Sequence, residues 1–135
     1  MRKTGNKVTE DITRYLAGRP GINLAILFGS LSRGRAMAHS DIDLAVAMAR
    51  PLTAEEKLEM IEGLAQIVGR PVDLVDLQSA DGLILSQILT TGNILLCNNR
   101  TLYAELIKKM LFNDADMMPY RDRILAERRK AWIGG

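Results

Sequence analysis

The feature that most constrains this chain is an apolar segment ending in Gly29-Ser30, followed ten residues later by an acidic one. Leu24 to Phe28 is a continuous apolar run, which is typical of a buried strand. Asp41 to Met48 alternates in polarity, so Asp41 and Asp43 share one strand face and apolar residues occupy the other. The pattern predicts two core strands that carry a Gly-Ser turn and a pair of carboxylates.

The rest of the chain alternates between helix-like and strand-like segments. Apolar spacing and capping residues predict four helices. The first spans residues 6–18, the second runs from the Thr53/Glu56 capping-box pattern to Gly69, and the third from a Ser79 cap to about Thr91. The fourth begins at Arg100, with breaks expected near Asn113-Asp114 and at Pro119. Further strands are expected over Pro71–Leu77 and Asn93–Cys97. This alternation places the chain in the α/β or α+β class.

A single domain is the simplest organisation for 135 residues without an internal repeat or linker. We expect residues 1–99 to form its main part and residues 100–135 a helical C-terminal extension that is a candidate partner-binding segment. The net charge of +2 does not favour nucleic acid or an anionic membrane as a partner. No apolar run is long enough to span a bilayer, and the lone Cys97 favours a reducing compartment, so we expect a cytoplasmic protein.

The acidic pair predicts a metal site. Asp41 and Asp43 lie two residues apart on one strand, so their side chains project from the same face only a few ångströms apart. Two like charges at that separation repel each other, and a divalent cation between them removes the repulsion. Mg²⁺ suits such a site because it takes one or two protein carboxylates together with phosphate oxygens and water.

The Gly-Ser turn predicts the phosphate side of the same site. Gly29 ends a buried strand, where the missing side chain lets a phosphate approach the backbone. Ser30 offers a hydroxyl, and residues Ser30 to Ala36 can begin a helix whose free N–H groups attract an anion. Arg33 can pair with triphosphate oxygens, and Ser40 can brace the loop into the acidic strand. The implied reaction is in-line nucleotidyl transfer from a metal-bound triphosphate.

A third carboxylate is expected from a neighbouring strand. Asp73 and Asp76 are candidates of opposite parity, so only one of them can face the site. We favour Asp73, which would complete a second metal site or accept the proton of an attacking hydroxyl.

The spacing of Gly29-Ser30 and Asp41-x-Asp43 is similar to the signature of the DNA polymerase β-like nucleotidyltransferase superfamily. Residues Leu27 to Val46, with Val72 to Val75 downstream, resemble its minimal nucleotidyltransferase branch. The resemblance covers roughly residues 8–97. It implies the fold of that superfamily, with a small mixed sheet flanked by helices.

The resemblance also implies a role for each site residue. Gly29 and Ser30 would bind the triphosphate of ATP. Asp41 and Asp43 would bind Mg²⁺ in a two-metal site, with Asp73 as the third acid.

Members of this branch are often antitoxins that pair with a HEPN-domain ribonuclease toxin. The resemblance implies a hetero-oligomer with such a toxin and transfer of AMP from ATP to a toxin tyrosine, which blocks the site that cuts RNA. Two alternatives stay open: a small-molecule acceptor such as an aminoglycoside, and a non-catalytic antitoxin that masks its toxin. A nucleic-acid polymerase is disfavoured because 135 residues leave little room for template handling, so no direct nucleic-acid binding is expected.

Overall fold

Four strands and four helices form a mixed α/β fold in the structure, a computed structural model that describes residues 4–29 and 41–116. In chain order the elements are α1 (Thr4–Ala17), β1 (Leu24–Phe28), β2 (Ile42–Ala47), α2 (Ala54–Val68), β3 (Val72–Asp76), α3 (Gly82–Thr91), β4 (Asn93–Cys97) and α4 (Arg100–Asp116). The strands form one sheet in the order β3-β2-β1-β4. β2 and β3 run parallel, and β1 is antiparallel to both of its neighbours, β2 and β4.

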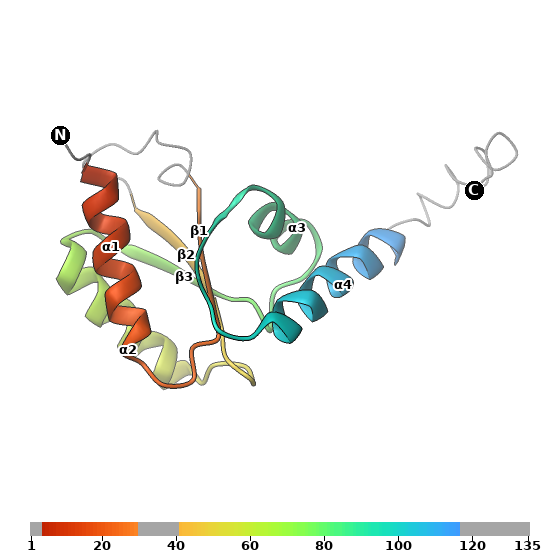
Figure 1. The fold of residues 1–135 in the computed structure, drawn as a ribbon, viewed down its shortest axis with the longest axis horizontal. Helices are drawn as coiled ribbons and strands as arrows, with labels where there is room; N and C mark the ends of the chain where they lie inside the picture. The colour runs from red at the N-terminus through yellow and green to blue at the C-terminus, as the bar shows by residue number, and fades with distance from the viewer. Residues whose placement is uncertain (1–3, 30–40, 117–135) are drawn as a thin grey trace, which may run out of the picture.

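Helices cover both faces of the sheet. Figure 1 shows α1 and α2 together on one face and α3 and α4 on the other. The face toward α1 and α2 packs a large apolar cluster that includes Ile12, Leu16, Leu44, Val46, Met60, Leu64 and Leu74. The opposite face packs a second cluster that includes Leu24, Ile26, Ala45, Leu77, Leu85, Ile88 and Leu106. Because β1 contributes to both clusters, its continuous apolar pattern is explained by burial on both sides.

The expected strands are confirmed with small differences at their ends. β1 and β4 have the predicted bounds, while β2 and β3 are slightly shorter than the apolar patterns suggested. α1 ends before Gly18, in agreement with the pattern over residues 6–18. None of the helices in the described part of the chain is long and apolar enough to cross a membrane.

Two expectations about helix ends are wrong. Ser79 does not cap α3, because its hydroxyl donates to the Asp76 carboxylate (3.3 Å) and the helix begins at Gly82 with Asp81 in the N-cap position. α4 continues through Asn113 and Asp114 to Asp116, so the expected break there does not occur. Pro119 lies outside the described residues.

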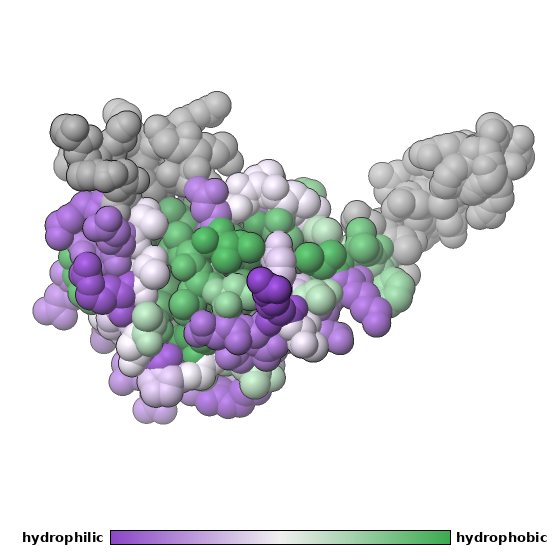
Figure 2. All heavy atoms as spheres, viewed as in Figure 1, coloured by the Kyte–Doolittle hydropathy of each residue, from purple (hydrophilic) through white to green (hydrophobic). Residues whose placement is uncertain are grey.

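The sheet has two edge strands, one with an exposed apolar side chain and one with an exposed acidic side chain. β4 is one of them, and its Ile94 side chain is 46% exposed. Figure 2 shows apolar side chains gathered in the middle of the face of the molecule that is viewed there. β3 is the other edge strand, and its Asp73 side chain is exposed.

The capping box of α2 is confirmed and includes an ion pair. The Glu56 amide donates to the Thr53 hydroxyl (3.0 Å), and the Thr53 amide donates to the Glu56 carboxylate (2.9 Å). The Arg50 guanidinium donates to both carboxylate oxygens of Glu56, at 2.7 and 2.8 Å. These bonds, the one from Arg50 foremost, lower the pKa of Glu56 to about 2. Glu56 therefore fixes the first turn of α2 and the loop before it.

The pH dependence of stability tests this role. Since the pKa of Glu56 is lower in the folded state than its ordinary value of 4.5, its stabilisation is complete above that value and is lost as pH falls toward 2. We expect Glu56→Gln to lower the melting temperature near neutral pH, and the gap from the wild type to narrow in acid. Thermal melts followed by circular dichroism measure the gap. Glu62→Gln on the same helix is the control and should melt close to the wild type; a Glu56→Gln gap that does not change with pH would contradict the role.

Candidate active site

Two acidic residues lie side by side on neighbouring strands. Asp43 of β2 is the register partner of Asp73 of β3, and the strands are parallel. The partner residues on either side, Leu44 with Leu74 and Ile42 with Val72, are buried in the cluster under α1 and α2. Asp43 and Asp73 must therefore project from the opposite face, with their Cα atoms roughly 5 Å apart across the strands.

Gly29 lies against the Asp43 side chain. It follows β1 directly and has a φ of 79°, a conformation that residues with a side chain rarely adopt. A Cβ atom at Gly29 would collide with the Asp43 carboxylate. Phe28, the preceding residue, is the register partner of Asp43 across β1 and β2. Gly29 thus makes room for the Asp43 carboxylate. The position of Gly29 in the sequence did not reveal this contact.

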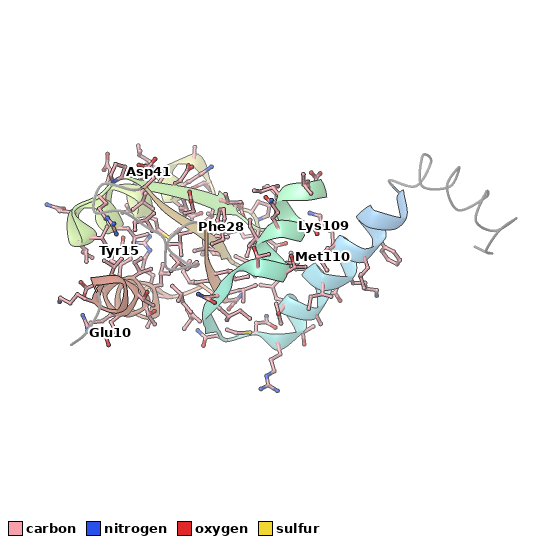
Figure 3. The ribbon with its side chains drawn as sticks, turned by 90° about the horizontal axis from the view of Figure 1, so that it is seen from above. Glu10, Tyr15, Phe28, Asp41, Lys109 and Met110 are labelled. Carbon is pink, nitrogen blue, oxygen red and sulfur yellow. The ribbon has the colours of Figure 1, made fainter. Side chains whose placement is uncertain are left out.

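Asp41 lies immediately before β2 and is exposed. It has the same parity along the chain as Asp43, so it extends the acidic row beyond the end of the strand. Figure 3 shows Asp41 well separated from Lys109 and Met110 of α4. Because β1 and β2 are antiparallel and Phe28 is opposite Asp43, the acidic row lies at the end of the sheet where β1 stops and β2 begins.

Asp76, the alternative third acid, has a structural environment. Its side chain is 8% exposed and accepts hydrogen bonds from the Leu52 amide (2.8 Å), the Gln78 amide (3.0 Å) and the Ser79 hydroxyl (3.3 Å). It joins the end of β3 to the loop that precedes α2. The bond from the Gln78 amide, two residues on, closes an Asx turn at the end of β3.

Several expected site residues lie outside the described ranges. Ser30, Arg33 and Ser40 fall between residues 30 and 40, as does the expected helix start. The end of the candidate partner-binding segment, residues 117–135, is also outside. The described part of the site consists of Gly29 and the three aspartates at positions 41, 43 and 73.

The described residues fit a magnesium ion that is bound together with a phosphate. Within the ranges 4–29 and 41–116, no three His, Cys, Asp or Glu side chains gather closely enough to hold a metal ion by themselves. Mg²⁺ does not need such a cage, since one or two carboxylates suffice when phosphate oxygens and water complete its coordination. The two-residue spacing of Asp41 and Asp43 next to a glycine meets that requirement.

Comparison with known proteins agrees with this geometry. A family model described as polymerase beta, nucleotidyltransferase matches residues 10–101, which include every described site residue. The chain belongs to this nucleotidyltransferase family. The protein adenylyltransferase MntA of Shewanella oneidensis is 41% identical to it over 73 residues, or 54% of this chain and 52% of MntA. The matched segment thus spans about half the length of that curated relative.

Solved structures of this nucleotidyltransferase family extend the similarity along nearly the whole chain. A chain from a crystal structure of a toxin-antitoxin with AMP-PNP is 30% identical, with a TM-score of 0.70 and coverage of 91% of this chain and 96% of that one. A chain from the complex of tri-AMPylated Shewanella oneidensis HEPN toxin with MNT antitoxin is 28% identical, with a TM-score of 0.64 and coverage of 92% and 94%. The predicted fold class is therefore confirmed.

The contact between Gly29 and Asp43 can be separated from backbone strain by comparing two glycines. Gly69 has a φ of 70° and nothing within 4 Å of its Cβ position, so Gly69→Ala should cost only the strain of that conformation, about 1 kcal/mol. Gly29→Ala has similar strain and must also displace the Asp43 carboxylate, so we expect a larger loss of about 2–3 kcal/mol. Urea denaturation measures both values, and equal losses would show that the Asp43 contact is unimportant.

The two candidate third acids should respond differently to the same substitution. Asp76→Asn places an amide nitrogen against a buried donor and should lower the free energy of unfolding by about 1–3 kcal/mol. Asp73→Asn alters an exposed side chain and should change it by no more than about 0.5 kcal/mol. Chemical denaturation of both variants measures these changes, and a marked loss of stability in Asp73→Asn would assign that residue a structural role.

Proposed function

We propose that this protein is a nucleotidyltransferase antitoxin that transfers AMP from ATP to a tyrosine hydroxyl of a cognate HEPN ribonuclease toxin and thereby neutralises it. The observation that carries the proposal is the register of Asp43 beside Asp73, with Gly29 packed against the Asp43 carboxylate. The family match supports the reaction class. The similarity to an MNT antitoxin in complex with a tri-AMPylated HEPN toxin supports the acceptor.

On this proposal the nucleotide binds at the end of β1. Gly29 leaves the backbone accessible to the triphosphate, and Ser30, Arg33 and Ser40 contribute polar groups from the loop that follows. Asp41 and Asp43 would hold Mg²⁺, which would supply positive charge beside the phosphate oxygens. With that ion bound, the two carboxylates would help to position the triphosphate.

Asp73 acts on the acceptor side. Its carboxylate is exposed and lies one strand beyond Asp43, which supports a position beside the reacting centre. It accepts the proton of the attacking hydroxyl while the hydroxyl oxygen bonds to the α-phosphorus and pyrophosphate leaves. Asp73 can also contribute to a second metal site without a change in this role.

Two other functions make different demands on these residues. A small-molecule nucleotidyltransferase would keep the same chemistry with another acceptor, whereas the exposure of Asp41 and Asp73 favours an acceptor that docks from outside. A masking antitoxin would neutralise its toxin by binding alone. Such a protein has no need of two neighbouring carboxylates, whose repulsion is unfavourable without a cation.

The mass of the toxin tests the proposal. After incubation with this protein, ATP and Mg²⁺, a cognate HEPN toxin should gain one or more AMP units. Asp43→Asn should lower the initial rate about a hundredfold or more, because it removes a proposed ligand of Mg²⁺. EDTA should abolish the gain in mass, because it removes the ion itself.

The melting temperature of the Asp43→Asn variant checks that it folds, and its co-purification with the toxin checks that it still binds. A stable complex with no mass gain from the wild type, and neutralisation that survives Asp43→Asn, would establish masking instead. A gain on an aminoglycoside panel but not on the toxin would establish the small-molecule alternative.

A further inference from the structure

A groove of about 380 Å³ lies along the outer edge of β3. One wall comes from the start of α2 and the loop before it, the other from the start of α3 and the loop before it, and the floor from β3 itself. Residues from each part include Leu52, Thr53, Lys57, Val75, Ser79 and Ile84. Val75 lies on the same face of β3 as Asp73, about 7 Å along the strand, so the groove lies near the candidate active site.

The strand that forms the floor has an open hydrogen-bonding edge. The Ile42 amide donates to the Pro71 carbonyl (2.9 Å), and the Leu77 amide donates to the Val46 carbonyl (2.8 Å). Since alternate residues of a strand direct their backbone groups to opposite sides, Val72 and Leu74 direct theirs away from β2. No strand within the described parts of the chain pairs with that edge. An open edge is a template for an extended polypeptide.

Sheet order makes this edge the approach route for an acceptor. Gly29 follows β1, Asp43 is on β2 and Asp73 is on β3, so the acids lead from the proposed triphosphate position outward to the β3 edge. The opposite edge strand, β4, is separated from Asp73 by two strands. An acceptor hydroxyl can therefore reach Asp73 most directly from the side of the groove.

We propose that an extended segment of the toxin pairs with the outer edge of β3 and presents its acceptor hydroxyl opposite Asp73. This inference rests on the proposed AMP transfer and adds the place and manner of docking. Residues opposite each other on paired strands point to the same face, so a tyrosine opposite Asp73 directs its side chain to the face that carries Asp43. Strand pairing thus fixes both the position and the facing of the hydroxyl.

The groove walls specify the neighbours of the acceptor tyrosine. The neighbour of the tyrosine on the Leu74 side lies opposite Leu74 and faces α2. Lys57 of α2 lies there and makes no ion pair with a described residue. An acidic residue at that position complements the charge. The residue after it lies opposite Val75 and faces α3, where the Ile84 side chain is 40% exposed. The occupant therefore carries a hydroxyl, an acidic and an apolar residue in succession.

Groove variants test the side-chain contacts. Lys57→Glu reverses the complementary charge and Ile84→Glu removes the apolar wall, so each should slow AMP transfer to the cognate HEPN toxin about tenfold. Ile67→Glu is the matched control for Ile84→Glu, because Ile67 is 46% exposed at the far end of α2 and outside the groove. Lys7→Glu on α1, whose side chain is 71% exposed and lies outside the groove, is the control for the charge reversal. Melting temperatures of all four variants check that they fold.

Hydrogen exchange tests the strand pairing itself. In the complex with the HEPN protein, the amides of Val72 and Leu74 should exchange at least about tenfold more slowly than in the free protein, because each gains a backbone acceptor. If the groove variants label the toxin slowly but the amides of Val72 and Leu74 gain no protection in the wild-type complex, strand pairing is overturned. Normal labelling by both variants would overturn the docking site while leaving AMP transfer intact. No labelling by the wild type would instead refute the proposed function, and this inference with it.

Discussion

The position of the acidic residues depends on the register in which β2 and β3 bury their apolar side chains. Leu44 and Leu74 are partners across the two strands, and both are buried under α1 and α2. Side chains alternate along a strand, so this burial forces Asp43 and Asp73 to the opposite face. A slip of one residue in β3 would bury Asp73 and expose Leu74, at a cost in apolar burial of roughly 2 kcal/mol for the leucine alone. The core therefore determines which carboxylates can meet.

The ends of these strands are fixed by polar contacts that do not take part in the proposed chemistry. Asp76 ties the end of β3 to the Leu52 amide before α2, and the Gln78 side chain donates to the Met48 carbonyl after β2 (2.7 Å). Both contacts join the loops that leave the two strands at the end opposite Asp41. At the acidic end of the sheet the carboxylates of Asp41 and Asp73 stay exposed and that of Asp43 half-buried. This division of roles explains why Asp73 and Asp76 differ so strongly although they share one strand.

Most elements could be predicted from the sequence because their signals are local. The apolar run of β1 and the Thr53 capping box both depend on residues close together in the chain, and both are confirmed. The Ser79 prediction failed because its hydroxyl has a competing acceptor in Asp76, which the capping pattern does not reveal. The pairing of Asp43 with Asp73 could be expected only in part: parity left Asp73 and Asp76 as alternatives, and the parallel register that separates them arises from packing between distant segments.

The order of the strands also bears on how one small sheet could hold two substrates. A larger enzyme can surround its acceptor with a second domain, whereas the described sheet ends at β3, one strand beyond Asp43. An edge strand is usually a liability because its free backbone groups pair with other chains. Here the same exposure is useful if the acceptor is itself a protein, since backbone pairing aligns a segment of the acceptor without many side-chain contacts. Affinity then comes mainly from main-chain hydrogen bonds. Selectivity comes from the groove side chains, such as Lys57 and Ile84, that contact the residues beside the acceptor tyrosine. On this view the open edge of β3 is where the acceptor is held.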